Sequence, residues 1–180
     1  HALWRHYATA SGRTFLDVAE FRASRGHGVR FALDVLRATH AREPSFACFG
    51  LHEWAMVYRL PPEAIRHQSL PLRLSPAQTD AVVEAHEIRC THFDAFRFFT
   101  PDARPRNLTT PDREHQADNE QPGCLHGGAM DLYRWAFKLS PGVPSAMVLD
   151  AFDVARAARL LDMRSSPYDV RSLGLTNIPV

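Results

Sequence analysis

The sequence predicts a mainly α fold: a single helical domain spanning residues 1–180, with one or two short strands. Apolar side chains recur at helical spacing in several segments, and alternation typical of strands is scarce. Hydrophobic residues make up 45% and charged residues 23% of the chain, as in ordinary globular domains. A length of 180 residues is enough for one domain with a sizeable core.

Two segments predict helices near the start of the chain. The segment 14–26 opens at a potential cap, Thr14, and Gly26 and Gly28 predict a break after it. A second helix is then expected over 29–41, with Phe31 and Val35 on one face. Because the chain starts at His1 without a methionine, we expect that it lacks an N-terminal portion of a longer protein.

Two further helices are predicted in the next part of the chain. The segment 49–60 is apolar nearly all round, which is typical of a buried helix, and it stops at Pro61. The segment 74–88 has the clearest helix start, with Ser75 as N-cap and Pro76 at the first helical position.

The segment 89–99, "RCTHFDAFRFF", fits either a strand or a helix of three turns. In a strand, His92 and Asp94 would point to the same face. The polar, proline-rich segment 100–123 predicts a long loop, and loops of that length inside a compact domain are usually functional or mobile.

The C-terminal part predicts two more helices. One begins at about Ala129, with an inner stripe that includes Trp135. Ser145 is the predicted cap of the other, and the segment 165–175 is expected to be turn and coil. The expected inner face of the second helix consists of Met147, Val148, Ala151, Phe152, Ala155, Ala158 and Leu161.

Charge and cysteine content narrow the functional classes. A formal net charge of +1 argues against a strongly basic nucleic-acid binder. No window approaches 18 consecutive apolar residues and no signal peptide is visible, so we expect no membrane association. The three cysteines form no C-x-x-C pair, which favours free thiols in a cytoplasmic protein.

Three histidines stand in apolar or glycine-containing segments, each with an acidic residue nearby. His52 lies in the most apolar predicted helix, His92 lies among aromatic residues, and His126 follows the long loop. Imidazole and carboxylate groups together bind zinc or iron, so these three histidines are the predicted metal ligands. We expect them to converge on one pocket with Glu53 and Asp94.

Three carboxylates are the candidate catalytic groups. A carboxylate in the apolar surroundings of Glu53 must pair, stay protonated or bind something. Asp94 completes an H-x-D pair with His92, and Glu120 stands in "NEQPGCLHGG" at the start of a helix. Any of the three can complete a metal's ligand shell or act as a general base.

Five stretches resemble an actinobacterial protein family commonly labelled 3-methyladenine DNA glycosylase, and together they cover most of the chain from Cys48 to Asp169. The pair Gly127-Gly128 departs from that family's more usual pattern. The stretches are "CFGLHEWAMVYRLP", "LRLSPAQTDAVVEAHEIRCTHFDAFRFFTPDARPRN", "EQPGCLH", "MDLYRWAFKLSPGVPS" and "LDMRSSPYD".

The resemblance implies an N-glycosidic hydrolase that acts on an alkylated or modified nucleobase in DNA or a related nucleoside. A carboxylate such as Glu53 or Asp94 would activate water, aromatic walls would stack a flipped base, and arginines would hold phosphates. The expected substrate-binding residues are Trp54, Tyr58, Phe96, Arg97, Trp135, Arg104 and Arg106.

Two alternatives stay open at this point. One is a metal-dependent hydrolase or oxygenase for a small molecule, with His52, His92 and His126 as ligands of zinc or iron. The other is a helical binding module without activity, in which the buried polar residues serve only packing.

Overall fold

A computed structural model describes residues 3–48, 50–67 and 69–180 and confirms a mainly α single domain. About half of the chain is helical. Phe49, the first residue of one predicted helix, lies outside the described residues. The elements are β1 (Tyr7–Ala10), β2 (Arg13–Leu16), α1 (Val18–His40), α2 (Leu51–Ala55), α3 (Pro76–Ala85), α4 (Phe93–Phe96), α5 (Gln116–Asn119), α6 (Asp131–Lys138) and α7 (Ser145–Ser165).

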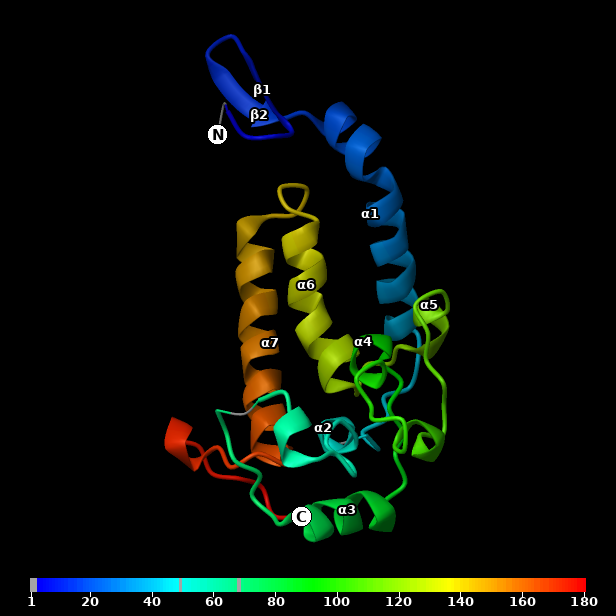
Figure 1. Ribbon diagram of the computed structural model, residues 1–180. Helices are drawn as coiled ribbons and strands as arrows, with labels where there is room; N and C mark the ends of the chain where they lie inside the picture. Colours follow the sequence, from blue (N-terminus) through cyan, green and yellow to red (C-terminus); the bar gives the residue numbers. More distant parts are fainter. Residues whose placement is uncertain (1–2, 49, 68) are drawn as a thin grey trace.

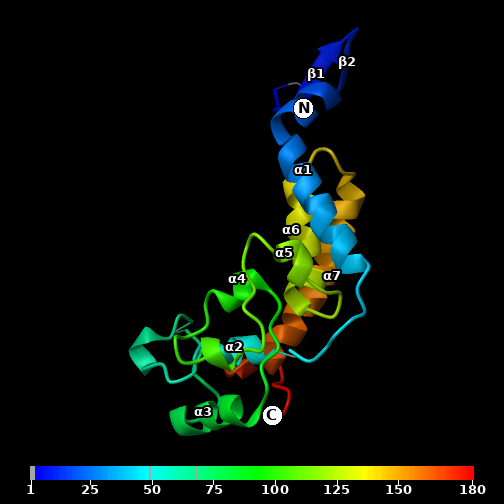
Figure 2. The same cartoon turned by 90° about the vertical axis from the view of Figure 1, so that its right-hand side faces the viewer.

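Three helices, α1, α6 and α7, run side by side and form the long part of the molecule (Figures 1 and 2). The antiparallel hairpin β1–β2 extends beyond one end of them, and α2, α3 and α4 gather around the other end (Figure 1). Phe31 of α1 packs edge-on against Trp135 of α6, with ring centroids 5.8 Å apart. The short helix α5 lies against α1. No helix of the described ranges combines the length and the apolar character needed to cross a membrane.

The predicted break at Gly26 and Gly28 is wrong, because α1 is one continuous helix. A glycine inside a helix costs only about 1 kcal/mol, which the remaining residues of a long helix offset. Thr14 is not the cap either: it lies in β2, and the Asp17 side chain accepts the N–H of Glu20 at the start of α1.

The predicted helix over 49–60 is much shorter in the structure. Only α2 is helical, followed by turns that include Arg59 with a φ of +51°. Burial on all sides is confirmed for the four residues 52–55. The start of α3 is also confirmed, because Ser75 and Gln78 form a complete capping box.

The ambiguous segment 89–99 adopts the helical alternative for one turn, α4, whose N-cap is His92. His92 and Asp94 therefore do not share the face of a strand. The loop that follows is secured by Asn107, whose amide nitrogen donates to Cys90 O (2.9 Å) and whose amide oxygen accepts the Cys90 N–H (2.8 Å).

A π-helical segment, Leu125–Met130, leads directly into α6 and packs against α7. Single π-helical turns inside helices occur frequently at functional sites. The α7 helix begins at Ser145, with Pro144 rather than Ser145 as N-cap. Its predicted inner face is partly wrong: Met147 and Phe152 are exposed, and the face instead continues to Asp162 and Ser165.

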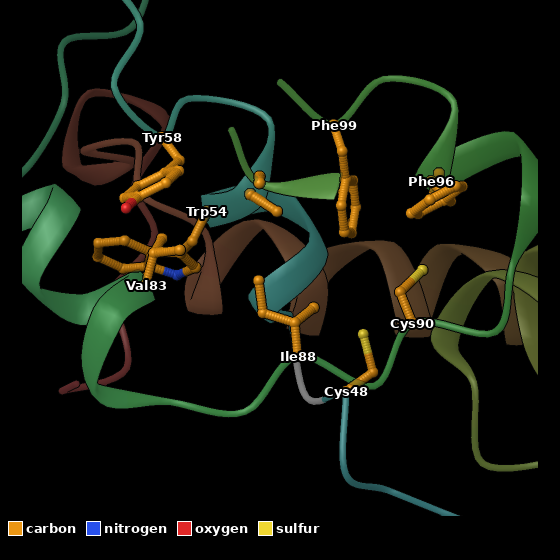
Figure 3. Packing of buried hydrophobic residues seen from close by; sticks show 11 residues of the cluster. Cys48, Trp54, Tyr58, Val83, Ile88, Cys90, Phe96 and Phe99 are labelled. Carbon is orange, nitrogen blue, oxygen red and sulfur yellow. The ribbon is translucent and has the colours of Figure 1, made fainter. Parts of the chain in front are cut away.

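The main core cluster fills the end of the molecule where α2, α3 and α4 meet. In Figure 3, Trp54 and Tyr58 lie beside Val83 of α3, while Cys48, Cys90 and Phe96 lie toward the other end of the cluster. The indole N–H of Trp54 donates to Ser165 O at 2.8 Å, which ties α2 to the end of α7. This anchoring fixes the position of the two residues that precede Trp54, His52 and Glu53.

Candidate functional site

The predicted convergence of the three histidines is confirmed. His52 of α2 and His126 of the π-helical segment have ring centroids 4.5 Å apart, and the rings meet edge to face. His92, the N-cap of α4, stacks on His126 with centroids 5.1 Å apart. Three segments that are far apart in the sequence thus meet in one buried place.

One side of this place is a group with the chemistry of a metal site: His52, Glu53, His126 and Asp162. Each offers a nitrogen or a carboxylate oxygen, and these atoms all lie within 4.8 Å of one another. Arg159 donates to Glu53 Oε1 at 3.2 Å and to Asp162 Oδ2 at 2.8 Å. The guanidinium therefore holds both carboxylates from the surface side without using all of their oxygens.

Three buried atoms of this group lack a hydrogen-bond partner among the described residues: His52 Nε2, His126 Nδ1 and Asp162 Oδ1. His52 Nε2 and Asp162 Oδ1 lie 3.0 Å apart, yet they are not aligned as donor and acceptor. Buried polar atoms without partners are rare in native proteins and need an explanation. Two atoms that bind the same metal ion lie about as far apart, and the lone pairs of both atoms point to the ion.

The two histidines of this group, His52 and His126, have pKa values shifted in opposite directions. Burial, together with the neighbouring charge of His52, lowers the pKa of His126 to about 3, so its nitrogen lone pair is available. Burial also disfavours a charge on His52, but contacts with Asp162 and Cys48 outweigh burial and raise its pKa to about 10. A metal that binds His52 must therefore displace a proton, and its affinity should rise with pH.

The Nδ1 atom of His52 lies 3.3 Å from the Cys48 sulfur. When Nδ1 carries the proton and donates to sulfur, Nε2 is left free on the side of Asp162 and His126. Such outer partners orient metal-binding imidazoles and set their tautomer. Cys48 is thus placed to position His52.

A second group, His92, Glu120 and Asp131, lies on the other side of His126. His92 Nε2 is 3.0 Å from Asp131 Oδ2 and 3.6 Å from Glu120 Oε1. The Ala95 N–H donates to His92 Nδ1 at 3.1 Å, so Nδ1 carries a lone pair and Nε2 must carry the proton. This tautomer makes His92 a donor to Asp131 and counts against His92 as a direct metal ligand.

Glu120 is almost fully buried, and its Oε2 lacks a hydrogen-bond partner among the described residues. Burial raises the pKa of this carboxyl to about 7. A Cβ atom on Gly127 would lie 1.6 Å from Glu120 Oε2, so only glycine leaves room for the carboxylate. A Cβ on Gly128 would in turn lie 2.1 Å from Pro122 O. Close packing therefore explains both glycines of the pair.

Glu120→Gln is expected to remove a pH dependence of stability, measured on chelator-treated protein. Because the pKa is raised from 4.5 to about 7 by folding, the folded state binds the proton more tightly, and stability falls as pH rises through this window. The loss amounts to about 3 kcal/mol, and the amide does not titrate. Chemical denaturation at pH 4.5 and pH 7.5 should show a flatter profile for the variant than for an exposed control, Glu114→Gln. Equal pH profiles would contradict the assignment.

Asp94 stands apart from both groups. Its half-buried carboxylate pairs with Arg134 and with Arg97, the latter at 3.3 Å. Arg134 also donates to Asp131 Oδ2 at 2.7 Å, so Asp94 is linked to the site through this arginine alone among the contacts described. The structure therefore brings Glu53 and Glu120 to the histidines but not Asp94.

The predicted substrate-binding residues do not form one surface. Trp54, Tyr58 and Phe96 belong to the buried core, and Trp135 is buried with Arg134 over its ring. Arg97 and Arg104 are exposed, and Arg106 donates to Glu84 O at 3.2 Å from a half-buried position. Their role toward a substrate stays a prediction.

Sequence reasoning missed the two aspartates Asp162 and Asp131 and the arginines that hold them. Asp162 follows Ala155 and Ala158 at helical spacing. An acidic residue on the buried face of a helix could therefore have identified Asp162 as a site residue. Asp131 similarly stands four residues before Trp135 on the buried side of α6.

The fold and the site define the class of the molecule: a mainly α protein with a buried cluster of histidines and carboxylates. Comparisons with protein-family models, with curated proteins and with solved structures gave no match. The functional assignment therefore depends on the residues of the site themselves.

Proposed function

We propose that the protein is a metal-dependent hydrolase that binds one divalent transition metal through His52, His126 and Asp162. The observation that carries the proposal is the set of three buried ligand atoms without a hydrogen bond, one from each of these residues, of which His52 Nε2 and Asp162 Oδ1 lie 3.0 Å apart. Two histidines and one carboxylate suit zinc or iron. Such an ion, when bound, lowers the pKa of a water ligand to near neutral and polarises an acyl or phosphoryl oxygen.

Glu53 is the proposed general base. It belongs to the same group of four and, like Asp162, is held by Arg159, but none of the three ligand atoms without a hydrogen bond belongs to it. Burial and the nearby Asp162 charge raise the pKa of Glu53, which brings it closer to the range where a carboxylate accepts a proton from water. Glu53 also lines a polar cavity of about 90 Å³, together with Arg159 and Tyr168, which can hold that water.

An oxygenase is the alternative use of two histidines and one carboxylate, with iron(II) as the metal. We favour hydrolysis because Glu53 supplies a second carboxylate beside the three ligands, which Arg159 holds together with Asp162. A three-ligand zinc site with an adjacent glutamate is the arrangement of many metal-dependent hydrolases.

The test uses protein purified without a tag. We expect about one equivalent of zinc or iron, and chelation should abolish hydrolysis of a panel of ester, amide and phosphate substrates until metal is restored. Glu53→Gln should keep the metal and lose at least about 100-fold in turnover, as expected for loss of a general base. The exposed variant His115→Ala is the control. Less than about a tenth of an equivalent of any transition metal, under conditions that saturate zinc sites, would contradict the proposal.

A second candidate is the N-glycosidic hydrolase implied by the resemblance, and one surface feature favours it. Arg66 and Arg97 both lie against the ring of Phe98, with Cζ atoms 4.1 Å and 4.4 Å from its centroid. Exposed arginines beside an aromatic ring suit phosphate contacts and base stacking in DNA. The protein should then release free base from methylated DNA. A control glycosylase that releases base while this protein does not would exclude that candidate.

A further inference from the structure

A cavity of about 180 Å³ adjoins the proposed metal site. His52 belongs to both, and two other lining residues, Leu125 and Leu161, are the sequence neighbours of His126 and Asp162. Ala129 of the π-helical segment and Cys124 also line the cavity. The cavity and the proposed metal site thus share His52 and two short stretches of the chain.

The chemistry of the lining selects an uncharged ligand. Among the described residues that line the cavity, none is lysine, arginine, aspartate or glutamate. The polar groups at its side chains are the thiols of Cys48 and Cys124 and the imidazole of His52. Both ring nitrogens of His52 already face protein atoms, with Nε2 at 3.0 Å from Asp162 Oδ1 and Nδ1 at 3.3 Å from the Cys48 sulfur. An ionic group would lose its hydration here without gaining a partner of opposite charge that is not already paired within the protein.

The volume sets the size of the ligand. An apolar cavity of about 150 Å³ accommodates benzene. A space of about 180 Å³ therefore has room for one six-membered ring with a small substituent, and it excludes fused systems of three rings. The polar cavity beside Glu53 is only half as large, about 90 Å³, and suits water rather than a ring.

We propose that the cavity binds a compact, uncharged ring of the substrate, next to the metal ligands. The link to catalysis rests on the proposed hydrolase function, whereas ring binding itself does not require a metal. In this arrangement the ring lies against His52, Leu125 and Leu161, and the bond to be hydrolysed lies on the side of His52, the one proposed ligand among the residues that line the cavity. The substrate class is then a small neutral aromatic or heterocyclic compound with a hydrolysable substituent.

The test uses phenol as the probe and metal-free, chelator-treated protein. Two-dimensional NMR should show saturable shifts of the amides of His52, Leu125 and Leu161, with a dissociation constant on the order of 1 mM. Benzoate, equal in ring size but charged, should bind at least about ten-fold more weakly. Shifts confined to other surfaces, no saturation, or equal binding of benzoate would overturn the proposal.

Variants that fill the cavity with a larger side chain provide a second test of the proposal. Ala129→Leu should lower phenol affinity at least about ten-fold, while Ala157→Leu on the exposed side of α7 should leave it unchanged. Leu161→Phe is the second filling variant, in case the first perturbs folding as judged by circular dichroism. Unchanged affinity in a folded filling variant would overturn the proposal.

Because the probe needs no metal, the two proposals can fail separately. Phenol binding without metal uptake would contradict the hydrolase proposal alone, and metal uptake without phenol binding would contradict the cavity proposal alone.

Discussion

Asp162→Asn is expected to lower the affinity for zinc at least about 100-fold, because even outer-shell changes at metal sites cost 10–100-fold. Asp162 is fully buried, and its Oδ1 lies 3.0 Å from His52 Nε2 without forming a hydrogen bond, so the charge it contributes would be lost to the ion directly. Competition with a chromophoric chelator measures the affinity. Asp153→Asn, on the exposed side of the same helix, is the matched control and should bind like the unaltered protein.

His126→Ala complements this variant, because His126 Nδ1 makes no hydrogen bond whose loss would disturb folding. We expect a similar loss of zinc affinity, together with a lower thermal stability of the metal-free protein because the ring contacts with His52 and His92 are lost. Zinc affinity that stays within about three-fold of the unaltered protein in both variants would show that these residues are not ligands.

Gly127→Ala is expected to destabilise the protein by about 3 kcal/mol, the upper part of the range for overpacked cores. The new methyl group would lie 1.6 Å from Glu120 Oε2 and 2.6 Å from Glu120 Cδ, and the almost fully buried glutamate has little room to move. Chemical denaturation of the metal-free protein measures the free energy of unfolding.

Two controls separate this clash from a general effect of alanine. Gly28→Ala, inside α1 with nothing within 4 Å of the new Cβ, should stabilise by roughly 0.5–1 kcal/mol. Gly127→Ala combined with Glu120→Ala should recover part of the loss relative to the sum of the single changes. Additive losses would mean that Glu120 is not the side chain that requires the glycine.

Local signals in the sequence were sufficient for several features. The pairing of Ser75 with Gln78 depends only on residues three apart, so the start of α3 was predictable. The convergence of His52, His92 and His126 was predictable because each is a polar residue in a stretch that must be buried. Glu53 and Glu120 could be predicted as residues of the site for the same reason.

Features that depend on tertiary contacts were not predictable from the sequence. The length of α2 is limited by turns that end at Arg59, whose backbone N–H bonds to Asp80 of α3, a contact distant in sequence. The inner face of α7 could be assigned only once α6 and the π-helical segment were placed against it. For that reason Met147 and Phe152 were expected inside, while Asp162 was overlooked.

The role of His92 illustrates a further limit. Its identity and burial suggested a ligand, but its tautomer is decided by a backbone hydrogen bond from Ala95, which exists only because His92 caps α4. A sequence pattern cannot distinguish a histidine with a free nitrogen from one whose two nitrogens are both engaged.

The most direct test of the central claim is a crystal structure of zinc-loaded protein with anomalous diffraction recorded on both sides of the zinc absorption edge. We predict one strong anomalous peak about 2.0–2.2 Å from His52 Nε2, His126 Nδ1 and an Asp162 oxygen. Glu53 should lie beside the peak, and His92 should remain bonded to Asp131. A map without a peak at this position, or with the peak on His92 and Glu120 instead, would contradict the account.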